Sequence, residues 1–252
     1  MKMAPLSVCL IVHNEESRVE RALRSAAWAD EIIVMDSGST DRTAEICRRY
    51  TDKVYTRPFD DYASQKNAAV SRAAGKWILS LDADEEITSL LKNKIEKALQ
   101  NSSGANGYRI RRRSRIFGRF FRFSGTQADR PLRFFRKGAG RFEGTIHESL
   151  VLEGRTDSLD GELTHYTYDS LKDYMSRFNR YTGMEAERFI RERHKAPGFF
   201  EIKIKPWLIF FWLYLFQQGF RDGREGFQFC VLSAFYTFVK HLKHFEKLRN
   251  LG

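Results

Sequence analysis

Over the first hundred residues, short runs of hydrophobic residues alternate with segments in which hydrophobic residues recur at helical spacing. Short apolar runs that predict buried strands lie at 6–12, 31–35, 53–56 and 77–81. Apolar residues at helical spacing between these runs predict helices at 16–28, 42–50, 62–74 and 89–99. This alternation favours an α/β fold, in which a mostly parallel sheet is covered by helices on both faces.

Polar clusters follow three of the predicted strands directly. They are His13–Glu15, Asp36–Ser39 and Asp82–Asp84. Ligands of parallel α/β sheets bind beyond the carboxyl ends of the strands. We therefore expect the three clusters to meet at one edge of the sheet.

The third cluster carries two carboxylates, Asp82 and Asp84, after the buried run that starts at Trp77. Residues two apart in an extended segment point the same way, so both carboxylates can face one site. Mg²⁺ is commonly held by one or two such oxygens together with substrate phosphates. The alternative is a solvated acidic helix start, with Asp82 or Asp84 as the N-cap.

The loop Asp36-Ser-Gly-Ser-Thr-Asp41 can serve as a nucleotide pocket. Its first Asp can accept the imide N–H of a uracil ring, and the small residues allow close backbone approach. An ordinary loop with an N-cap residue is the alternative. Lys66 opens a predicted helix, where it either reaches a phosphate or is solvated.

Three segments together resemble glycosyltransferase family 2 in order and spacing across about residues 1–100. They are Leu6–Glu16, Ile32–Asp41 and Gln65–Asn67 continued by Gly75–Glu85. The resemblance implies a GT-A fold, Rossmann-like with a mostly parallel sheet, and a nucleotide-sugar donor. It also implies that Asp82 contacts the ribose and that Asp84 binds Mn²⁺ or Mg²⁺. The nucleotide-sugar site predicted in this way comprises His13, Asn14, Glu15, Asp36, Ser37, Gly38, Lys66, Asp82, Ala83 and Asp84.

The segment Gly140–Glu148 is the second candidate for chemistry. An inverting transfer needs a base that takes the proton from the acceptor hydroxyl. Glu148 is the predicted base and His147 an additional metal ligand, with Glu143 as the reserve base and His165 as an alternative ligand. An isolated His-Glu pair at the surface is the other reading. The Ile-His-Glu motif also resembles the bacterial branch of the family that adds glucose to the lipopolysaccharide inner core.

Charge divides the chain unevenly. Residues 1–104 carry 15 Lys and Arg against 16 Asp and Glu, whereas the whole chain has a net charge of +11. Residues 108–142 hold eleven arginines and one lysine against one acid, Asp129, and include short predicted strands at 108–111 and 132–136. The first interpretation of this block is that it contacts an anionic acceptor or a membrane surface, and the second is that it forms a solvated basic face. Nucleic-acid binding ranks third, because no nucleic-acid recognition module accompanies the block. We therefore expect no nucleic-acid partner.

The pattern becomes helical at 170–193, and aromatic and basic blocks alternate from Phe199 onward. Two apolar runs, 206–216 and 227–239, are shorter than the roughly 20 residues that a spanning helix needs. Aromatic and cationic flanks suit helices that lie in the interface of an anionic membrane. A buried helical pair or a homodimer contact is the alternative. The three cysteines show no metal or redox spacing, which suits a cytosolic protein.

We therefore expect a GT-A domain at 1–168, divided into a nucleotide-sugar half (1–104) and an acceptor half (105–168), and a basic helical extension at 169–252. The resemblance implies an inverting, metal-dependent glycosyltransferase that moves a hexose, glucose from UDP-glucose, onto a lipopolysaccharide core heptose or a similar lipid-linked glycan. Its expected location is peripheral, on the cytoplasmic face of the inner membrane. The alternatives are a polyprenyl-phosphate glycosyltransferase and a non-enzymatic basic RNA-binding module.

Overall fold

The computed structural model describes residues 5–100, 104–144, 148–193 and 195–250. The chain forms two compact units, each built from two segments. Unit 1 comprises Met1–Arg112 and Asp129–His165, and unit 2 comprises Arg113–Ala128 and Tyr166–Gly252. The domain boundary after residue 168, which we expect from the sequence, stays a prediction.

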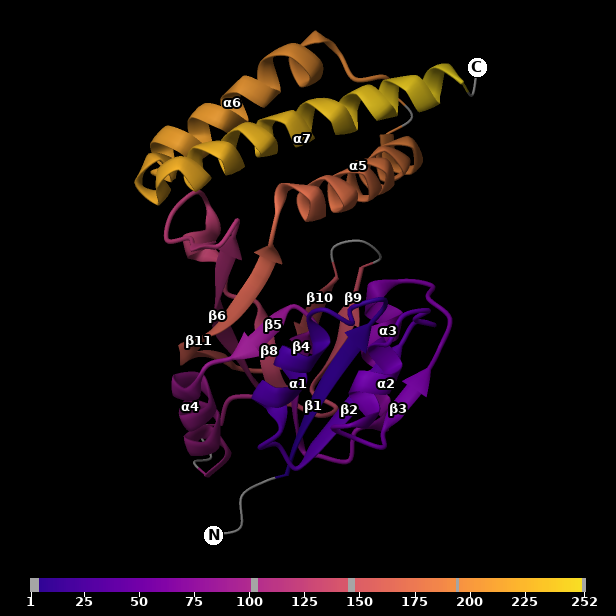
Figure 1. Ribbon diagram of the computed structural model, residues 1–252, viewed down its shortest axis with the longest axis vertical. Coiled ribbons are helices and arrows are strands. Elements are labelled where there is room, and N and C mark those ends of the chain that lie inside the picture. The colour runs from indigo at the N-terminus through magenta and orange to yellow at the C-terminus, as the bar shows by residue number, and fades with distance from the viewer. Residues whose placement is uncertain (1–4, 101–103, 145–147, 194, 251–252) are drawn as a thin grey trace. The chain divides into compact units, whose positions relative to one another are not determined.

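Four parallel strands form the first part of the sheet in unit 1 (Figure 1), in the order β3-β2-β1-β4. They are β1 (Leu6–Val12), β2 (Glu31–Asp36), β3 (Val54–Thr56) and β4 (Trp77–Asp82). The four strands predicted from the apolar runs are thereby confirmed. In the register, Val12 pairs with Asp36, and Ile11 pairs with Asp82. The three polar clusters therefore leave the sheet at one edge.

Helices cover both faces of these strands, as the alternation predicted. They are α1 (Val19–Ala26), α2 (Thr43–Arg48), α3 (Tyr62–Arg72) and α4 (Ser89–Gln100). Alternate residues of one strand face different cores: Val8 and Leu10 pack in one hydrophobic cluster and Cys9 packs in the other. Helix α1 begins later than predicted, because Glu15 O accepts hydrogen bonds from the N–H groups of Arg18 and Val19 in a turn before it.

The rest of the sheet is antiparallel and returns from later in the chain. Its full order is β3-β2-β1-β4-β8-β6-β11-β5. The added strands are β5 (Glu85–Ile87), β6 (Gly107–Ile116), β8 (Leu132–Arg136) and β11 (Thr156–Tyr168). A separate hairpin joins β9 (Gly140–Glu143) to β10 (Ser149–Leu152). The short strand β5 pairs with β11 so that His165 stands opposite Glu85.

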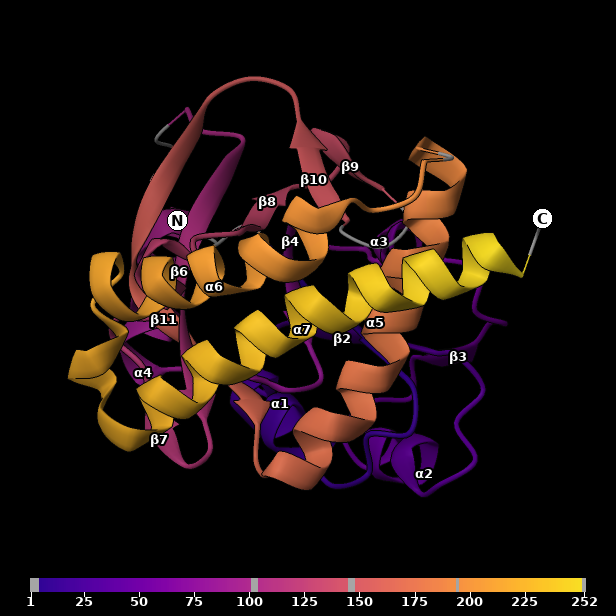
Figure 2. The ribbon, with the colours of Figure 1, turned by 90° about the horizontal axis from the view of Figure 1, so that it is seen from above.

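Unit 2 is mainly helical, with three main helices that lie against one another (Figure 2). Its elements are β7 (Arg119–Phe120), which pairs with the end of β6, then η1 (Thr126–Ala128), α5 (Leu171–Arg193), η2 (Phe200–Ile204), α6 (Lys205–Phe211), η3 (Trp212–Phe216), η4 (Gly219–Asp222) and α7 (Gly223–Arg249). Helix α5 packs on α7 through Phe178, which stacks on Phe235, and through Tyr174, whose hydroxyl donates to Leu232 O. The helical segment predicted at 170–193 is confirmed.

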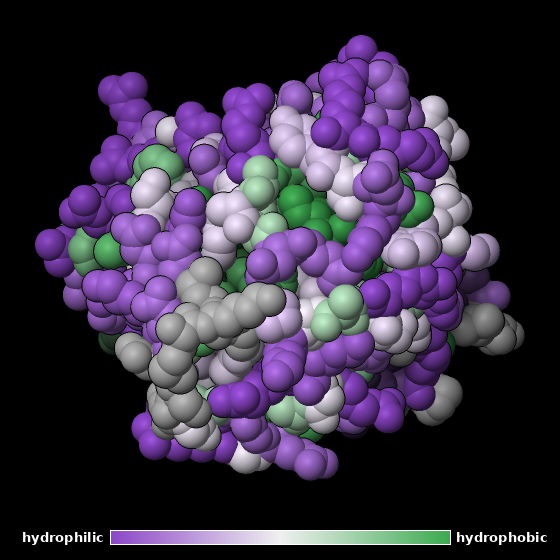
Figure 3. All heavy atoms as spheres, turned by 90° about the horizontal axis from the view of Figure 1, so that it is seen from below, coloured by the Kyte–Doolittle hydropathy of each residue, from purple (hydrophilic) through white to green (hydrophobic). Residues whose placement is uncertain are grey.

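Hydrophobic side chains are distributed unequally over the surface. The face seen from below in Figure 3 is largely hydrophilic, with hydrophobic atoms exposed in small areas between polar side chains. In unit 2, by contrast, large apolar side chains of η2, α6 and η3 are open to solvent, among them Trp207 and Phe216, which are 66% and 71% exposed. Within the described residues, none of the helices is both long enough and apolar enough to cross a membrane.

Gly75 allows the chain entering β4 to pass close to β1. A Cβ at this position would lie 2.6 Å from Ser7 Oγ and 2.9 Å from Pro5 O. We expect Gly75→Ala to lower the free energy of unfolding by about 2 kcal/mol, because the backbone must shift to relieve the overlap. Chemical denaturation followed by circular dichroism measures this change. Gly183→Ala is the control: nothing lies within 4 Å of the added methyl, so this helical substitution should not destabilise the protein.

Candidate active site

The loops after β1 and β2 hold each other in place. Asn14 has a positive φ of 54°, a backbone conformation that Asn tolerates better than most residues. Its N–H donates to Ser39 Oγ (2.9 Å), and its Oδ1 accepts from Thr40 N–H (2.8 Å). The neighbouring His13 is exposed, and Glu15 donates its N–H to Thr43 Oγ1 (2.7 Å). The predicted residues of the two loops therefore lie side by side.

Asp36 lies at the base of this pair of loops and is buried. Its Oδ1 accepts hydrogen bonds from Ser39 N–H (3.0 Å) and Ser39 Oγ (2.6 Å). Among the described residues, Oδ2 has no hydrogen-bond donor. Gly38 follows with a φ of 83°, a left-handed conformation that favours glycine. The loop thus presents a carboxylate that is fixed by one oxygen and can accept from a ligand with the other.

Helix α3 carries two polar side chains that connect different parts of the site, Gln65 and Asn67. Gln65 Nε2 donates to Ser37 Oγ (3.2 Å) in the loop after β2. Asn67 exchanges two hydrogen bonds with the backbone of Phe142 in β9, both of 2.9 Å. Helix α3 therefore ties the second loop to the β9–β10 hairpin, in which Glu148 directly precedes β10.

Lys66 joins two of the predicted acidic residues. Its Nζ lies 2.9 Å from Asp82 Oδ1 and 2.7 Å from Glu148 Oε1, and its side chain is only 5% exposed. The ammonium group also lies 5.5 Å from the centre of the Phe142 ring. A buried ammonium needs such partners, because its desolvation is costly. The structure thus brings together Lys66, Asp82 and Glu148, which lie far apart in the sequence.

Arg133 on β8 is a charged member of this site that the sequence did not single out. Its guanidinium is buried, donates to Asp82 Oδ2, and donates to Glu85 Oε1 at 2.9 Å. Glu85 in turn accepts the N–H of Asp82 with Oε2 (3.0 Å), and it lies 3.4 Å from Arg112. One signal was available in the sequence: Arg133 interrupts an apolar strand, and a charge buried in this way needs an acidic partner.

These charges control the ionisation of Asp82. Burial raises the pKa of this carboxyl group, but the positive charges of Arg133 and Lys66 outweigh it and hold the pKa well below its usual range. For Arg133, burial lowers the pKa, and Asp82 and Glu85 raise it above its ordinary value. Asp82 is therefore a carboxylate at neutral pH and is already engaged by two cations.

Asp84 lies two residues further on and faces His165 instead. Their Oδ2 and Nε2 atoms are 3.5 Å apart, and each side chain is 14% exposed. Burial lowers the pKa of His165, but the Asp84 carboxylate outweighs this and raises it. A carboxylate oxygen beside an imidazole nitrogen is a donor pair that suits Mn²⁺, and the oxygen also suits Mg²⁺. The alternative ligand His165 thus lies beside Asp84.

The remaining predicted site residues lie in different places. Ala83 is buried between the two carboxylates in the sequence. Glu143 lies in β9 at the surface, where it pairs with Arg141 at 3.4 Å. His147 lies outside the described residues. In the described part of the chain, His, Cys, Asp and Glu side chains form no group of three or more that could hold a metal ion.

The parallel part of the sheet, with acidic loops at its carboxyl edge, is the arrangement expected of a GT-A fold. The sequence model of the family described as Glycosyl transferase family 2 matches residues 7–150, more than half of the chain. The chain therefore belongs to glycosyltransferase family 2. The resemblance found from the sequence motifs is thereby confirmed.

Curated relatives match along nearly the whole chain. The lipopolysaccharide core biosynthesis glycosyltransferase LpsC of Rhizobium meliloti is 29% identical, over 96% of this chain and 93% of its own. An uncharacterized glycosyltransferase of Rickettsia bellii is 31% identical, over 98% of this chain and 87% of its own.

Solved structures show a more distant likeness. The crystal structure of S. aureus TarS 1-349 is 14% identical and covers 98% of this chain and 92% of its own, with a TM-score of 0.45. Glucosyl-3-phosphoglycerate synthase from Mycobacterium tuberculosis, in complex with Mn²⁺, UDP-glucose and phosphoglyceric acid, is 23% identical over 44% of each chain, with a TM-score of 0.37.

The buried guanidinium of Arg133, which lies between Asp82 and Glu85, leads to a prediction about stability. We expect Arg133→Met to lower the free energy of unfolding by about 3 kcal/mol, because the substitution leaves buried carboxylates without their main partner. Adding Glu85→Gln should restore part of this loss, since it removes one of the two carboxylates that have lost the Arg133 partner. Denaturant unfolding of the two single variants and the double variant measures the coupling. Strictly additive losses would contradict the assigned ion pair.

Proposed function

We propose that this glycosyltransferase moves a hexose, glucose from UDP-glucose, onto a heptose or similar sugar of a lipopolysaccharide core or related lipid-linked glycan, with inversion at the anomeric carbon. The observation that carries the proposal is the Lys66 bridge, which holds Glu148 next to Asp82. A base beside a donor contact is what a direct displacement requires. The name of the Rhizobium meliloti relative supports the class of acceptor.

In this proposal the loops after β1 and β2 bind the uridine. His13, Asn14 and Glu15 line one side, and Asp36, Ser37 and Gly38 line the other. The free Oδ2 of Asp36 accepts the imide N–H of the uracil, since Oδ1 is already used by Ser39. Asp82 and Ala83 lie at the ribose, where the depressed pKa of Asp82 keeps its carboxylate ionised.

Asp84 and His165 would hold the divalent cation, Mn²⁺ or Mg²⁺, with His147 as a further candidate outside the described residues. The donor pair fits such an ion, because both side chains are nearly buried and face each other. A bound cation supplies charge neutralisation for the departing diphosphate. Lys66 adds a second positive charge beside Asp82.

Glu148 is the proposed base. It takes the proton of the acceptor hydroxyl as the hydroxyl oxygen forms its bond to the anomeric carbon. The bond from that carbon to the phosphate oxygen breaks in the same step, and UDP leaves with the electron pair. The role of Lys66 is positional, because its bond to Glu148 holds the base on the side of the donor.

The exposed aromatic side chains of unit 2 support a peripheral membrane location. Phe199, Trp207 and Phe216 are each at least 66% exposed, and Lys203 and Lys205 lie in the same segment. Aromatic and cationic residues together suit the headgroup region of an anionic leaflet. We propose contact with the cytoplasmic face of the inner membrane, and a homodimer contact is the alternative use of this surface.

Calorimetric titration with UDP tests the donor site. We expect binding in the presence of Mn²⁺ and little or none with chelator, because the diphosphate is held through the cation. Asp84→Ala should abolish both the metal-dependent binding of UDP and the transfer of sugar. The control Asp52→Ala, at an exposed position of the same unit, should change neither UDP binding nor transfer. Full UDP binding and transfer by Asp84→Ala would remove Asp84 from the site.

Glu148→Gln tests the base. This variant should bind UDP like the wild type and lose transfer by about 100-fold or more, since general base catalysis typically contributes 10²–10⁴-fold. Glu143→Gln is the matched control on the same hairpin and should transfer normally. Product formation from radiolabelled UDP-glucose measures both. Transfer near the wild-type rate in Glu148→Gln, with a loss in Glu143→Gln, would move the base to Glu143.

A further inference from the structure

The strand order of unit 1 sets the order of the loops along the edge of the proposed donor site. In the order β3-β2-β1-β4, the loop after β3 lies beside the loop after β2, on the side away from β4 (Figure 1). Asp36, the proposed contact of the base, ends β2, whereas Asp84, the proposed cation ligand, follows β4. A nucleotide that extends between them has its base toward β3. The loop after β3 therefore borders the base end of the proposed site.

Hydrogen bonds fix the loop after β3 against the loop after β2. The N–H of Arg57 donates to Asp36 O at 2.9 Å. Gln65 on α3 is fully buried, and its Nε2 donates to the backbone oxygens of Arg57 (2.9 Å) and Pro58 (3.0 Å). The same nitrogen lies 3.2 Å from Ser37 Oγ in the loop after β2. One buried amide group thus holds the two loops together.

The charged side chains of the loop after β3 form their bonds within the loop and at the start of α3. The guanidinium of Arg57 donates to both oxygens of the Asp60 carboxylate, at 2.5 and 2.6 Å. Asp61 is the N-cap residue of α3, and its Oδ1 accepts from Ser64 N–H at 2.7 Å. The loop is therefore held on both sides of Phe59.

Phe59 is the aromatic residue that this loop presents to solvent. Its side chain is 47% exposed, and its ring meets the ring of Tyr62 at an angle of 72°, with centroids 5.1 Å apart. This edge-to-face contact leaves at least one face of the Phe59 ring uncovered by Tyr62. Within the described residues of unit 1, the other large apolar side chains that are similarly exposed are aliphatic, Leu90 on α4 and Val151 on β10. An exposed aromatic ring thus lies in the loop that borders the proposed base site.

We propose that Phe59 is a base-binding residue of the donor site, whose ring packs against the face of the uracil. The proposal rests on the proposed uridine site and adds an apolar contact to its polar ones. The carboxylate of Asp36 can recognise the edge of a uracil ring through the imide N–H, whereas an aromatic side chain recognises the flat face. Stacking on aromatic side chains is a general source of affinity for nucleic-acid bases.

Calorimetric titration with UDP in the presence of Mn²⁺ tests this contact. We expect Phe59→Ala to weaken UDP binding by about tenfold, the effect typical of removing one aromatic side chain on which a base stacks. Phe59→Tyr keeps the ring and should bind UDP like the wild type. The control, Leu90→Ala, removes an apolar side chain that is 56% exposed on α4 of the same unit, and it should leave Kd unchanged. Equal Kd values for the wild type and Phe59→Ala would overturn the proposal.

A fluorescent ring at the same position reports the contact directly. In Phe59→Trp, stacking of the uracil on the indole should quench the emission when UDP and Mn²⁺ are added. Leu90→Trp carries the same reporter on α4, and it should respond no more than the wild type with its four natural tryptophans. Equal responses of Phe59→Trp and Leu90→Trp would contradict a contact between the ring and the base.

Pyrophosphate separates contact with the base from a general effect on the site. With Mn²⁺ it can occupy the proposed diphosphate and cation positions, but it has no base. Phe59→Ala should therefore bind pyrophosphate like the wild type while its affinity for UDP falls. Equal losses for both ligands would reduce Phe59 to a support of the loop and overturn the proposal. If Phe59→Ala unfolds at a lower temperature than Leu90→Ala, Phe59→Leu takes its place, since it keeps an apolar side chain but removes the flat ring.

The wild type distinguishes failure of this contact from failure of the donor site. Absence of UDP binding by the wild type with Mn²⁺ would refute the proposed uridine site, and the contact of Phe59 with it. Binding of UDP by the wild type and equally by Phe59→Ala would overturn the contact alone and leave the donor site in place.

Discussion

The site depends on the pairing of two buried cations with the carboxylates around them. Lys66 and Arg133 are 4% and 5% exposed, and desolvation of such groups costs several kcal/mol unless acidic partners compensate. Their partners lie on β4, on β5 and just before β10. The cost of an unpaired charge therefore holds these elements in one arrangement around α3 and β8. The same pairing keeps Asp82 ionised and Glu148 beside it.

The donor half could be predicted from the sequence because its signals are local. Each strand is a short apolar run, each loop begins at the strand's end, and parallel pairing brings those ends together. Arg133 and Glu85 could not be assigned in this way. Their contacts depend on the antiparallel return of β8 beside β4, and periodicity within a strand does not report which distant strand becomes its neighbour. The meeting of Asp84 with His165 depends likewise on the pairing of β5, only three residues long, with β11.

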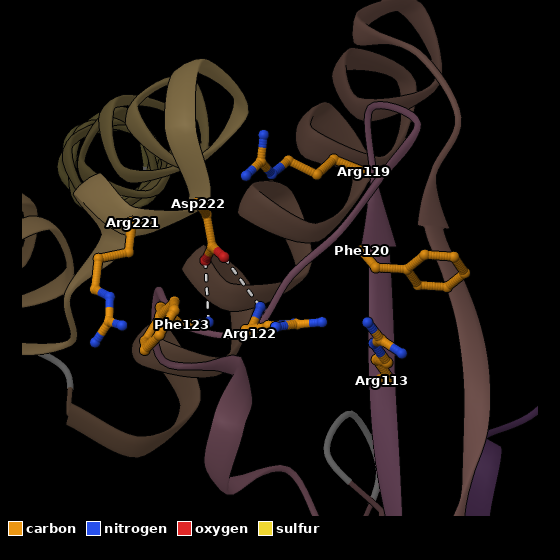
Figure 4. A pocket seen from close by; sticks show the side chains of 7 residues that line it. All are labelled: Arg113, Arg119, Phe120, Arg122, Phe123, Arg221 and Asp222. Carbon is orange, nitrogen blue, oxygen red and sulfur yellow. Dashed lines mark hydrogen bonds between the residues drawn. The ribbon is translucent and has the colours of Figure 1, made fainter.

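The arginine block seen in the sequence lies within the region matched by the family and belongs partly to unit 1 and partly to unit 2. The family match covers residues 7–150, which include the donor loops and the buried charge network. The arginine block that the sequence showed as one basic stretch divides in the structure. Arg112 and Arg133 neutralise carboxylates inside unit 1, whereas Arg113, Arg119 and Arg122 line a pocket of unit 2 (Figure 4). A high positive charge in one stretch of sequence thus reflects two separate structural demands.

The interleaving of the two units in the chain has a consequence for biosynthesis. The segment Arg113–Ala128 emerges from the ribosome between two parts of unit 1, but its partners come much later. Phe121 is 1% exposed in the finished protein and packs against Phe229 of α7. At ordinary translation speeds of about 5–20 residues per second, this phenylalanine waits roughly 5–20 s for that helix. During this interval unit 1 can already close its sheet, whereas the nascent loop carries an apolar side chain whose native partner on α7 has not yet been made.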